Sequence, residues 1–243
     1  MKTSLFLPLL TASGALLLSG CGKNGLNPTI RGEGPSVAET RSLASFSRVE
    51  VATDAELVIS QGPRQEVRVE GQRNILDILE TDASGGKLRV ETGRYNLRSH
   101  EPIRVLVTVP ALTSVRLSSN GHIRSAAAWD ASRFDVDATG SGSVELVLGQ
   151  VQDLHTAITG SGVVTLRGAA AAHTARLTGS GELQAYELST RSSDLTATGS
   201  GRSYVRVAER LDVKLTGSGS VYYKGRPSVS QRTTGSGRVV DAN

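Results

Sequence analysis

Six copies of the tetrapeptide Thr-Gly-Ser-Gly recur along the second half of this 243-residue chain and constrain its fold more than any other feature. The copies begin at Thr139, Thr159, Thr178, Thr198, Thr216 and Thr234. Successive copies are 20, 19, 20, 18 and 18 residues apart, and a degenerate copy, Ser118-Ser119-Asn120-Gly121, precedes them. A turn signature that recurs with a period near 20 residues is typical of a solenoid, in which each repeat forms one coil.

Apolar and polar residues alternate on both sides of these turns. Val136 and Ala138 precede the first copy with Asp137 between them, and Val144 and Leu146 follow it. Alternation with a period of two predicts strands with one buried face. A repeat of this length that already holds two strands leaves no room for a helix. The sequence therefore predicts an all-β fold, a single-stranded parallel β-helix (β-solenoid) with about 18–20 residues per coil.

The glycines of each turn are expected to point inward, where the chain folds over its own core and a side chain would collide. The Thr and Ser of each turn then point outward and stack on their counterparts in adjacent coils. A phosphate-binding glycine loop is disfavoured because these turns lack the strand-to-helix context and the lysine of such loops. The structural turn glycines are Gly140, Gly142, Gly160, Gly162, Gly179, Gly181, Gly199, Gly201, Gly217, Gly219, Gly235 and Gly237.

The N-terminus has the features of an export signal. Lys2 precedes an apolar run, residues 5–18, that is too short to span a membrane comfortably. The run ends in Leu18-Ser19-Gly20-Cys21, which resembles the bacterial lipobox, whose cysteine is acylated and becomes the first residue of the mature chain. We therefore predict a lipoprotein signal peptide over residues 1–20 and lipidation of Cys21, which would attach the protein to a membrane.

Two further predictions concern the segment that follows Cys21. Gly22 stands where an aspartate would favour retention in the inner membrane, so the lipobox resemblance implies anchoring in the outer membrane. Residues 21–42 are rich in Gly, Pro and polar residues without periodicity. They are expected to form the acylated cysteine and a flexible tether, with the folded domain over residues 43–243.

The region before the repeats is less regular but also rich in β-strand patterns. Strands are expected over residues 47–51, 56–59, 65–69, 87–90 and 103–109. Ile75, Leu76, Ile78 and Leu79 predict one short helix over residues 73–80, capped near Asn74. Gly85-Gly86 predicts a hairpin turn.

Several segments, in this order, resemble the GIN-domain family, which is described as the head of putative auto-transporter adhesins. They are Phe46-Ser47-Arg48-Val49-Glu50-Val51, Ile59-Ser60-Gln61-Gly62, Asn74-Ile75-Leu76-Asp77, Lys87-Leu88, Val107-Thr108-Val109-Pro110 and the serial Gly-Ser-Gly turns. The resemblance covers roughly residues 43 to 240. It implies a single-domain, right-handed parallel β-helix on a lipoprotein or secreted stem, and it brings no catalytic residue. The first turn departs mildly from the family pattern at Ser118-Ser119-Asn120-Gly121.

The main alternative to a binding or structural module of the cell envelope is a carbohydrate-active enzyme, a polysaccharide lyase or hydrolase. Such a site needs clustered carboxylates, and Asp194 and Asp212 are expected on adjacent coils. Asp at a bend more often has a structural role, so no catalytic residue, metal or cofactor is predicted. The histidines fall in different columns without metal-ligand spacing and are interpreted as surface or incidental residues: His100, His122, His155 and His173.

Charge is unevenly distributed along the predicted rod. Residues 126–195 contain eight acidic and four basic residues, whereas residues 196–243 contain eight basic and three acidic ones. In the basic part, Tyr204 and Tyr222 share one outward column, and Arg206 and Lys224 share another beside it. Rings next to cations suit an anionic glycan or a lipopolysaccharide phosphate, so these four residues are the candidate ligand site.

Two other roles are open to the last coils, and one class of partner is disfavoured. The four residues could instead only shield the last coils from edge-to-edge pairing. The coil ends are also a candidate surface for homo-oligomer contacts. The formal net charge of the whole chain, +4, is too small to indicate a nucleic-acid partner.

Overall fold

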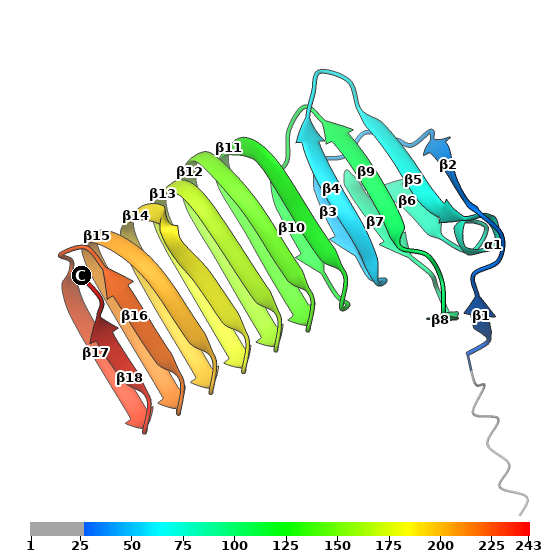
Figure 1. Cartoon of the computed structure of the whole chain (residues 1–243). Helices are drawn as coiled ribbons and strands as arrows, with labels where there is room; N and C mark the ends of the chain where they lie inside the picture. The colour runs from blue at the N-terminus through cyan, green and yellow to red at the C-terminus, as the bar shows by residue number, and fades with distance from the viewer. Residues whose placement is uncertain (1–26) are drawn as a thin grey trace, which may run out of the picture.

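The computed structural model describes residues 27–243, so the predicted signal peptide and Cys21 lie outside the described residues. The described part of the chain is nearly all β, with 72% of its residues in strands and about 2% in helix. Figure 1 shows a row of stacked coils that runs to the C-terminus from a group of strands formed by the N-terminal part. Within the described part of the chain, no helix is long and apolar enough to cross a membrane.

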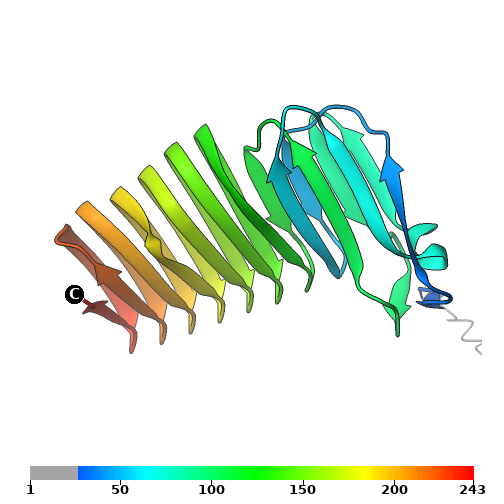
Figure 2. The ribbon, with the colours of Figure 1, turned by 45° about the horizontal axis from the view of Figure 1, so that its top comes forward.

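The repeats form a parallel solenoid, as predicted. Each long strand crosses one whole coil and pairs in parallel with the next, and the Thr of every turn is in register with its counterpart in adjacent coils. Figure 2 shows the coils as a regular stack. The strands are β10 (Ser114–Leu117), β11 (His122–Gly140), β12 (Ser143–Gly160), β13 (Val163–Gly179), β14 (Glu182–Gly199), β15 (Arg202–Gly217), β16 (Ser220–Lys224), β17 (Ser228–Gly235) and β18 (Arg238–Asp241).

The N-terminal part continues the solenoid but adds antiparallel pairs. Parallel pairing extends the coils from β10 to β3 (Arg48–Val51) and from β11 to β4 (Ala55–Gln61). β3 is also parallel to β7 (Lys87–Glu91), and β4 to β9 (Ile103–Val109). β7 forms the expected hairpin with β6 (Glu80–Ser84) around Gly85-Gly86. β5 (Glu66–Gln72) is antiparallel to β9.

The prediction of a flexible tether is wrong for residues 29–41. β2 (Ser36–Arg41) pairs antiparallel with β5, and β1 (Thr29–Arg31) pairs in parallel with β8 (Asn96–Arg98) in a separate two-stranded sheet. Every second residue of β2 is half-buried and none is fully buried, so its alternation is weak in the sequence. Backbone pairing with a distant strand supplies the order that composition does not reveal.

The predicted helix is shorter than expected. α1 covers Arg73–Leu76, and its N-cap residue, Gln72, makes no side-chain capping bond. Asn74 therefore does not cap the helix. Its side chain instead accepts a hydrogen bond from the Glu33 backbone N–H at 3.0 Å and donates one to the Arg31 carbonyl at 2.6 Å. These bonds fix the segment between β1 and β2 against the domain.

One continuous row of apolar side chains fills the solenoid interior. Trp129 and Phe134 are the largest fully buried side chains, and Leu146 and Leu166 are fully buried in successive coils. Complete burial of one such aliphatic side chain stabilises the fold by about 1.5–3 kcal/mol. Because each coil contributes several of these residues, the core needs few aromatic side chains.

The turn glycines are required, but the expected reason is only partly correct. The first glycine of each turn has a φ of 109–118°, a region that favours glycine. A Cβ on Gly179 would lie 2.5 Å from the carbonyl oxygen of Gly160 in the preceding coil, so it would point along the stack and not into the core. A Cβ on Gly181 would meet both the Gly162 carbonyl at 2.8 Å and the Ile158 side chain at 2.7 Å. Close stacking of backbones therefore excludes side chains at both positions.

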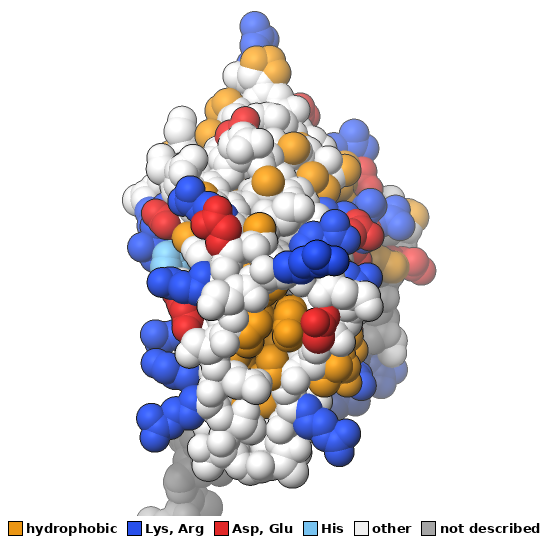
Figure 3. All heavy atoms as spheres, turned by 90° about the vertical axis from the view of Figure 1, so that its left-hand side faces the viewer, with side chains coloured by type: hydrophobic (Ala, Val, Ile, Leu, Met, Phe, Trp, Pro, Cys, Tyr) orange, Lys and Arg blue, Asp and Glu red, His pale blue; other side chains and the backbone are white. Residues whose placement is uncertain are grey.

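The C-terminal end of the rod is open. β17 has no buried residue, and within the described residues no further strand pairs with the outer edge of β17 or β18. Figure 3 views this end and shows apolar side chains at the centre, with Lys and Arg side chains around them. Val229, on β17, is the one large apolar side chain of the described chain classed as exposed.

Candidate functional site

The candidate ligand site lies on β15 and β16, and its two tyrosines stack as expected. Tyr204 and Tyr222 are register neighbours on adjacent coils. Their ring centroids are 5.1 Å apart, and the ring planes are 11° from parallel. Both rings are half-buried, which is less exposure than the sequence analysis assumed. The two rings therefore face each other along the rod axis and present their edges at the side of the coils.

The structure adds a third ring that the sequence analysis missed. Tyr186 packs edge-on against Tyr204, with ring centroids 5.3 Å apart and planes 69° apart. We call Tyr186, Tyr204 and Tyr222 the tyrosine ladder. Burial of Tyr186, followed by the influence of the other two tyrosines, raises the pKa of its hydroxyl. The Tyr186 hydroxyl is therefore neutral near pH 7 and can donate a hydrogen bond.

A bulge in β14 brings Tyr186 to this position. The pairing of β14 with β15 passes from Ala185–Val205 to Ser189–Arg206, so residues 186–188 face no residue of β15. The repeat that starts at Thr178 has 20 residues and the next has 18, and the three unpaired residues of this bulge, together with a second register shift between Thr190 and Ser192, account for the difference. The unequal spacing was visible in the sequence, but it did not show where in the coil the extra residues lie.

Two cations accompany the ladder. Lys224 Nζ lies 4.7 Å from the ring centroid of Tyr186, a cation–π contact. Arg206 is the register neighbour of Lys224, as expected, and its side chain is exposed. Among the described residues Arg206 has no ion-pair partner within 4 Å. An exposed guanidinium beside stacked rings is free to contact an anion.

A polar hollow of about 330 Å³ lies at the Tyr186 end of the ladder. Gln184 and Glu182 line it, and the Gln184 amide donates a hydrogen bond to Glu182 at 2.8 Å. Arg167 and Glu187 also line it and are joined by a hydrogen bond of 2.8 Å. Amide and carboxylate groups beside an aromatic face are suited to sugar hydroxyls.

The carboxylates of the enzyme alternative are adjacent but engaged. Asp194 and Asp212 are register neighbours, as expected. Arg210 Nε lies 3.1 Å from Asp212 Oδ2, and a terminal nitrogen of the same guanidinium lies 3.8 Å from Asp194 Oδ2. One arginine therefore bridges both groups in a surface ion-pair ladder. In the part of the chain that the structure describes, no group of three or more His, Cys, Asp or Glu residues could hold a metal ion.

The interpretation of the histidines as surface or incidental residues is wrong for His173. Its side chain is 1% exposed, and Nε2 lies 3.0 Å from Thr156 Oγ1 inside the solenoid. Desolvation by burial, with a smaller effect of His155, lowers the pKa of His173 to about 4. His173 occupies an inward position between Leu154 and Ser193 of the adjacent coils, which the alternation pattern could have shown.

The chain matches the family model described as putative auto-transporter adhesin, head GIN domain, over residues 45–227. The chain belongs to this family. The match spans three quarters of the sequence and includes all of the repeats except the last turn. Membership in an adhesin-like family is typical of surface or envelope proteins. No curated protein matches the chain.

Solved structures share the fold of this GIN domain. A putative adhesin from Bacteroides fragilis has a TM-score of 0.80 at 19% identity, covering 86% of this chain and 98% of that chain. A putative lipid binding protein from Parabacteroides distasonis has a TM-score of 0.74 at 21% identity, covering 88% and 100%. A putative adhesin from Parabacteroides merdae has a TM-score of 0.73 at 18% identity, with the same coverage. None of these descriptions names an enzymatic activity.

Proposed function

We propose that this protein is a cell-envelope lipoprotein whose GIN domain is a non-catalytic binding head for an anionic glycan. The tyrosine ladder is the observation that carries the proposal. Its rings place aromatic edges and phenol hydroxyls in a row along the rod, and Arg206 and Lys224 place positive charge at its side. Ring edges and hydroxyls can contact the C–H and hydroxyl groups of a carboxylated or phosphorylated sugar chain, and the cations can contact its anionic groups.

The position of the ladder also supports binding of an extended chain. Its members come from successive coils, which are stacked about 4.8 Å apart, so the surface runs along the rod axis. A polymer can lie along such a surface and contact several rings at once, whereas a single sugar would contact one. The polar hollow beside Tyr186 then provides hydrogen-bond partners for one end of the bound segment.

The anchor forms the second part of the proposal. Acylation of Cys21 would attach the chain to the outer membrane, and residues 22–28 would connect the anchor to β1. The first strand would then lie near the membrane, and the tyrosine ladder would lie toward the far end of the rod (Figure 1). This arrangement suits a head that reaches a partner away from its own membrane.

The experiment compares binding to an acidic and a neutral polysaccharide. The double variant Tyr204→Ala/Arg206→Ala should lose binding to the acidic polymer. Because salt weakens the wild-type contact, the difference in affinity between wild type and variant should become smaller as the salt concentration rises. Arg191→Ala, which removes an exposed arginine elsewhere on β14, is the charge-matched control and should bind normally. Unchanged binding by the folded double variant would leave the ladder with a role in edge protection only.

The carbohydrate-active enzyme alternative has its own test, based on the Asp194–Asp212 pair. Purified protein is incubated with acidic and neutral polysaccharides, and new reducing or unsaturated ends are measured. Because Arg210 pairs with both carboxylates, we expect no release. Release of ends that Asp194→Ala abolishes would replace the binding proposal with a catalytic one.

A further inference from the structure

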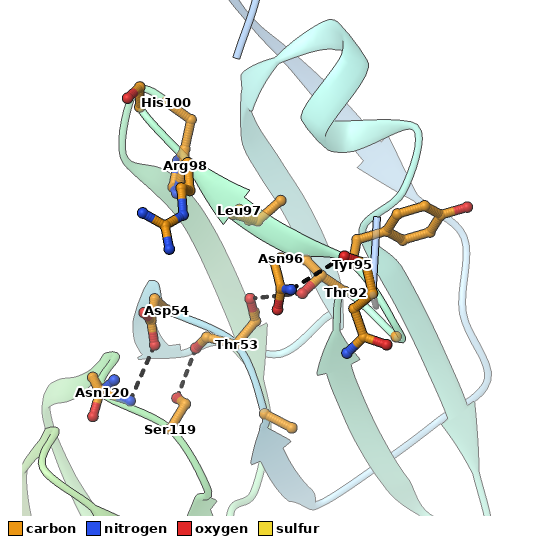
Figure 4. A pocket seen from close by; sticks show the side chains of 14 residues that line it. Thr53, Asp54, Thr92, Tyr95, Asn96, Leu97, Arg98, His100, Ser119 and Asn120 are labelled. Carbon is orange, nitrogen blue, oxygen red and sulfur yellow. Dashed lines mark hydrogen bonds between the residues drawn. The ribbon is translucent and has the colours of Figure 1, made fainter. Parts of the chain in front are cut away.

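A second hollow lies at the opposite end of the domain from the tyrosine ladder. It has a volume of about 820 Å³ and lies between β8 and two bends of the main sheet, at Thr53-Asp54 and Ser119-Asn120. Figure 4 shows polar side chains from all of these segments around it. The volume is within the range of small-molecule sites.

Hydrogen bonds hold the wall of this hollow in place. Ser119 Oγ donates to the Thr53 carbonyl at 2.7 Å, and the Asn120 backbone N–H donates to Asp54 Oδ1 at 3.1 Å. The buried Thr53 and Thr92 hydroxyls contact each other at 3.2 Å. These bonds fix the two bends relative to each other, so the polar groups are positioned before any ligand arrives.

Two arginines at this end lie side by side without a counter-ion. In the parallel β1–β8 pair, Arg31 is the register neighbour of Arg98, so both side chains are on the same face of the small sheet. Neither has a carboxylate within 4 Å among residues 27–243. Like charges on directly paired strand positions repel each other, and an anion between them would remove the repulsion.

An acidic residue, Asp54, lines the same hollow as Arg98. Figure 4 shows Arg98 and Asp54 on the hollow, with Asn96 farther along β8 from Arg98 and the Asp54 carboxylate bonded to Asn120. One oxygen of Asp54 accepts the Asn120 N–H, while Oδ2 has no partner among the described residues. A carboxylate oxygen of this kind accepts hydrogen bonds from hydroxyl groups.

We propose that this hollow binds a phosphorylated polyol, with the phosphate at Arg98 and hydroxyls at Asp54 and Asn96. A phosphate monoester carries a charge of about −1.5 to −2 at neutral pH, so the Arg98 guanidinium binds it, and Arg31, the register neighbour of Arg98 outside the lining of the hollow, adds positive charge nearby. Arginine also presents paired donors that fit phosphate oxygens. A phosphoglycerol group occurs in soluble glycerol phosphate, where the phosphate is a monoester, and in the headgroup of phosphatidylglycerol, where it is a diester with one negative charge. This site is independent of the ladder.

Calorimetric titration of the purified full-length protein tests the proposal. Glycerol 3-phosphate should bind saturably, and uncharged glycerol should not. Arg98→Ala should weaken binding by about tenfold or more, since a hydrogen bond to a charged group contributes about 1.5–3 kcal/mol. Arg94→Ala removes an exposed arginine that does not line the hollow, and it should change the affinity by less than about twofold.

A second titration distinguishes the two sources of the headgroup. Dihexanoyl phosphatidylglycerol below its micelle concentration should bind more tightly than glycerol 3-phosphate if the natural ligand is a lipid, and no more tightly if it is soluble. Dihexanoyl phosphatidylcholine is the control without headgroup hydroxyls. Tyr204→Ala/Arg206→Ala should leave all of these affinities unchanged. The absence of saturable binding by both phosphoglycerol compounds, or equal losses in Arg98→Ala and Arg94→Ala, would overturn the proposal.

Discussion

Replacing Gly179 with alanine tests whether backbone stacking at the turns sets the structure of the solenoid. Gly179 has a φ of 114°, which costs an L-residue about 1–3 kcal/mol. The new Cβ would also lie 2.5 Å from the Gly160 carbonyl oxygen, which accepts the Ser180 N–H at 2.9 Å. Moving the coils apart to relieve this contact weakens that bond and its neighbours by about 0.5–1.5 kcal/mol each. Together these effects predict a loss of about 3–5 kcal/mol.

Two control variants separate the causes of this loss. Gly85→Ala also places alanine at a positive φ, 54°, but its Cβ would meet no atom within 4 Å, so only about 1–2 kcal/mol should be lost. Ser180→Ala changes an exposed side chain in the same turn and should cost less than about 1 kcal/mol. Urea denaturation followed by circular dichroism measures all three. If Gly179→Ala costs no more than Gly85→Ala, the stacking argument is refuted.

Three further predictions concern His173, the lipidation of Cys21 and the C-terminal coil. The pKa of His173 is lowered to about 4, so its side chain is neutral in the folded protein at pH 7. The free energy of unfolding should therefore be full above pH 6.5 and fall by about 3 kcal/mol toward pH 4, because the unfolded state takes up the proton first. Denaturation curves at several pH values should show that His173→Leu removes this dependence. Cys21→Ser should leave the protein unprocessed or released from the membrane fraction, and unchanged size and partitioning on fractionation would contradict the lipobox interpretation. Self-association through the C-terminal coil should appear in sedimentation velocity as a concentration-dependent shift that Val229→Lys abolishes, and a concentration-independent monomer would exclude it.

The repeats made most of the fold predictable from the sequence. Period-two alternation identified the strands, and the fixed spacing of the Thr-Gly-Ser-Gly turns put Tyr204 beside Tyr222 and Arg206 beside Lys224. These relations depend only on register, which a regular repeat determines. The turn glycines were also identified, although the contacts that require them are mainly with backbone carbonyls of the preceding coil, and a core side chain such as Ile158 adds to them only at the second glycine of some turns.

The remaining features depend on contacts that the repeat does not encode. Tyr186 reaches the ladder because a bulge takes up extra residues of one coil, and the spacing alone does not place a bulge. β2 is ordered by antiparallel pairing with a strand about 30 residues away, although its own side chains are at most half-buried. The Arg31–Arg98 pair exists because β1 folds back beside β8, and neither short strand has a strong pattern.

The most direct test of the proposed function uses the tyrosines themselves as probes. The chain has five, so ring resonances of the ¹³C-tyrosine-labelled protein can be assigned by single substitution. On titration with an acidic oligosaccharide, the rings of Tyr186, Tyr204 and Tyr222 should shift together and saturate with one affinity, while Tyr95, near the other end of the rod, should stay in place. Saturable binding that leaves the three ladder rings unshifted would contradict the account.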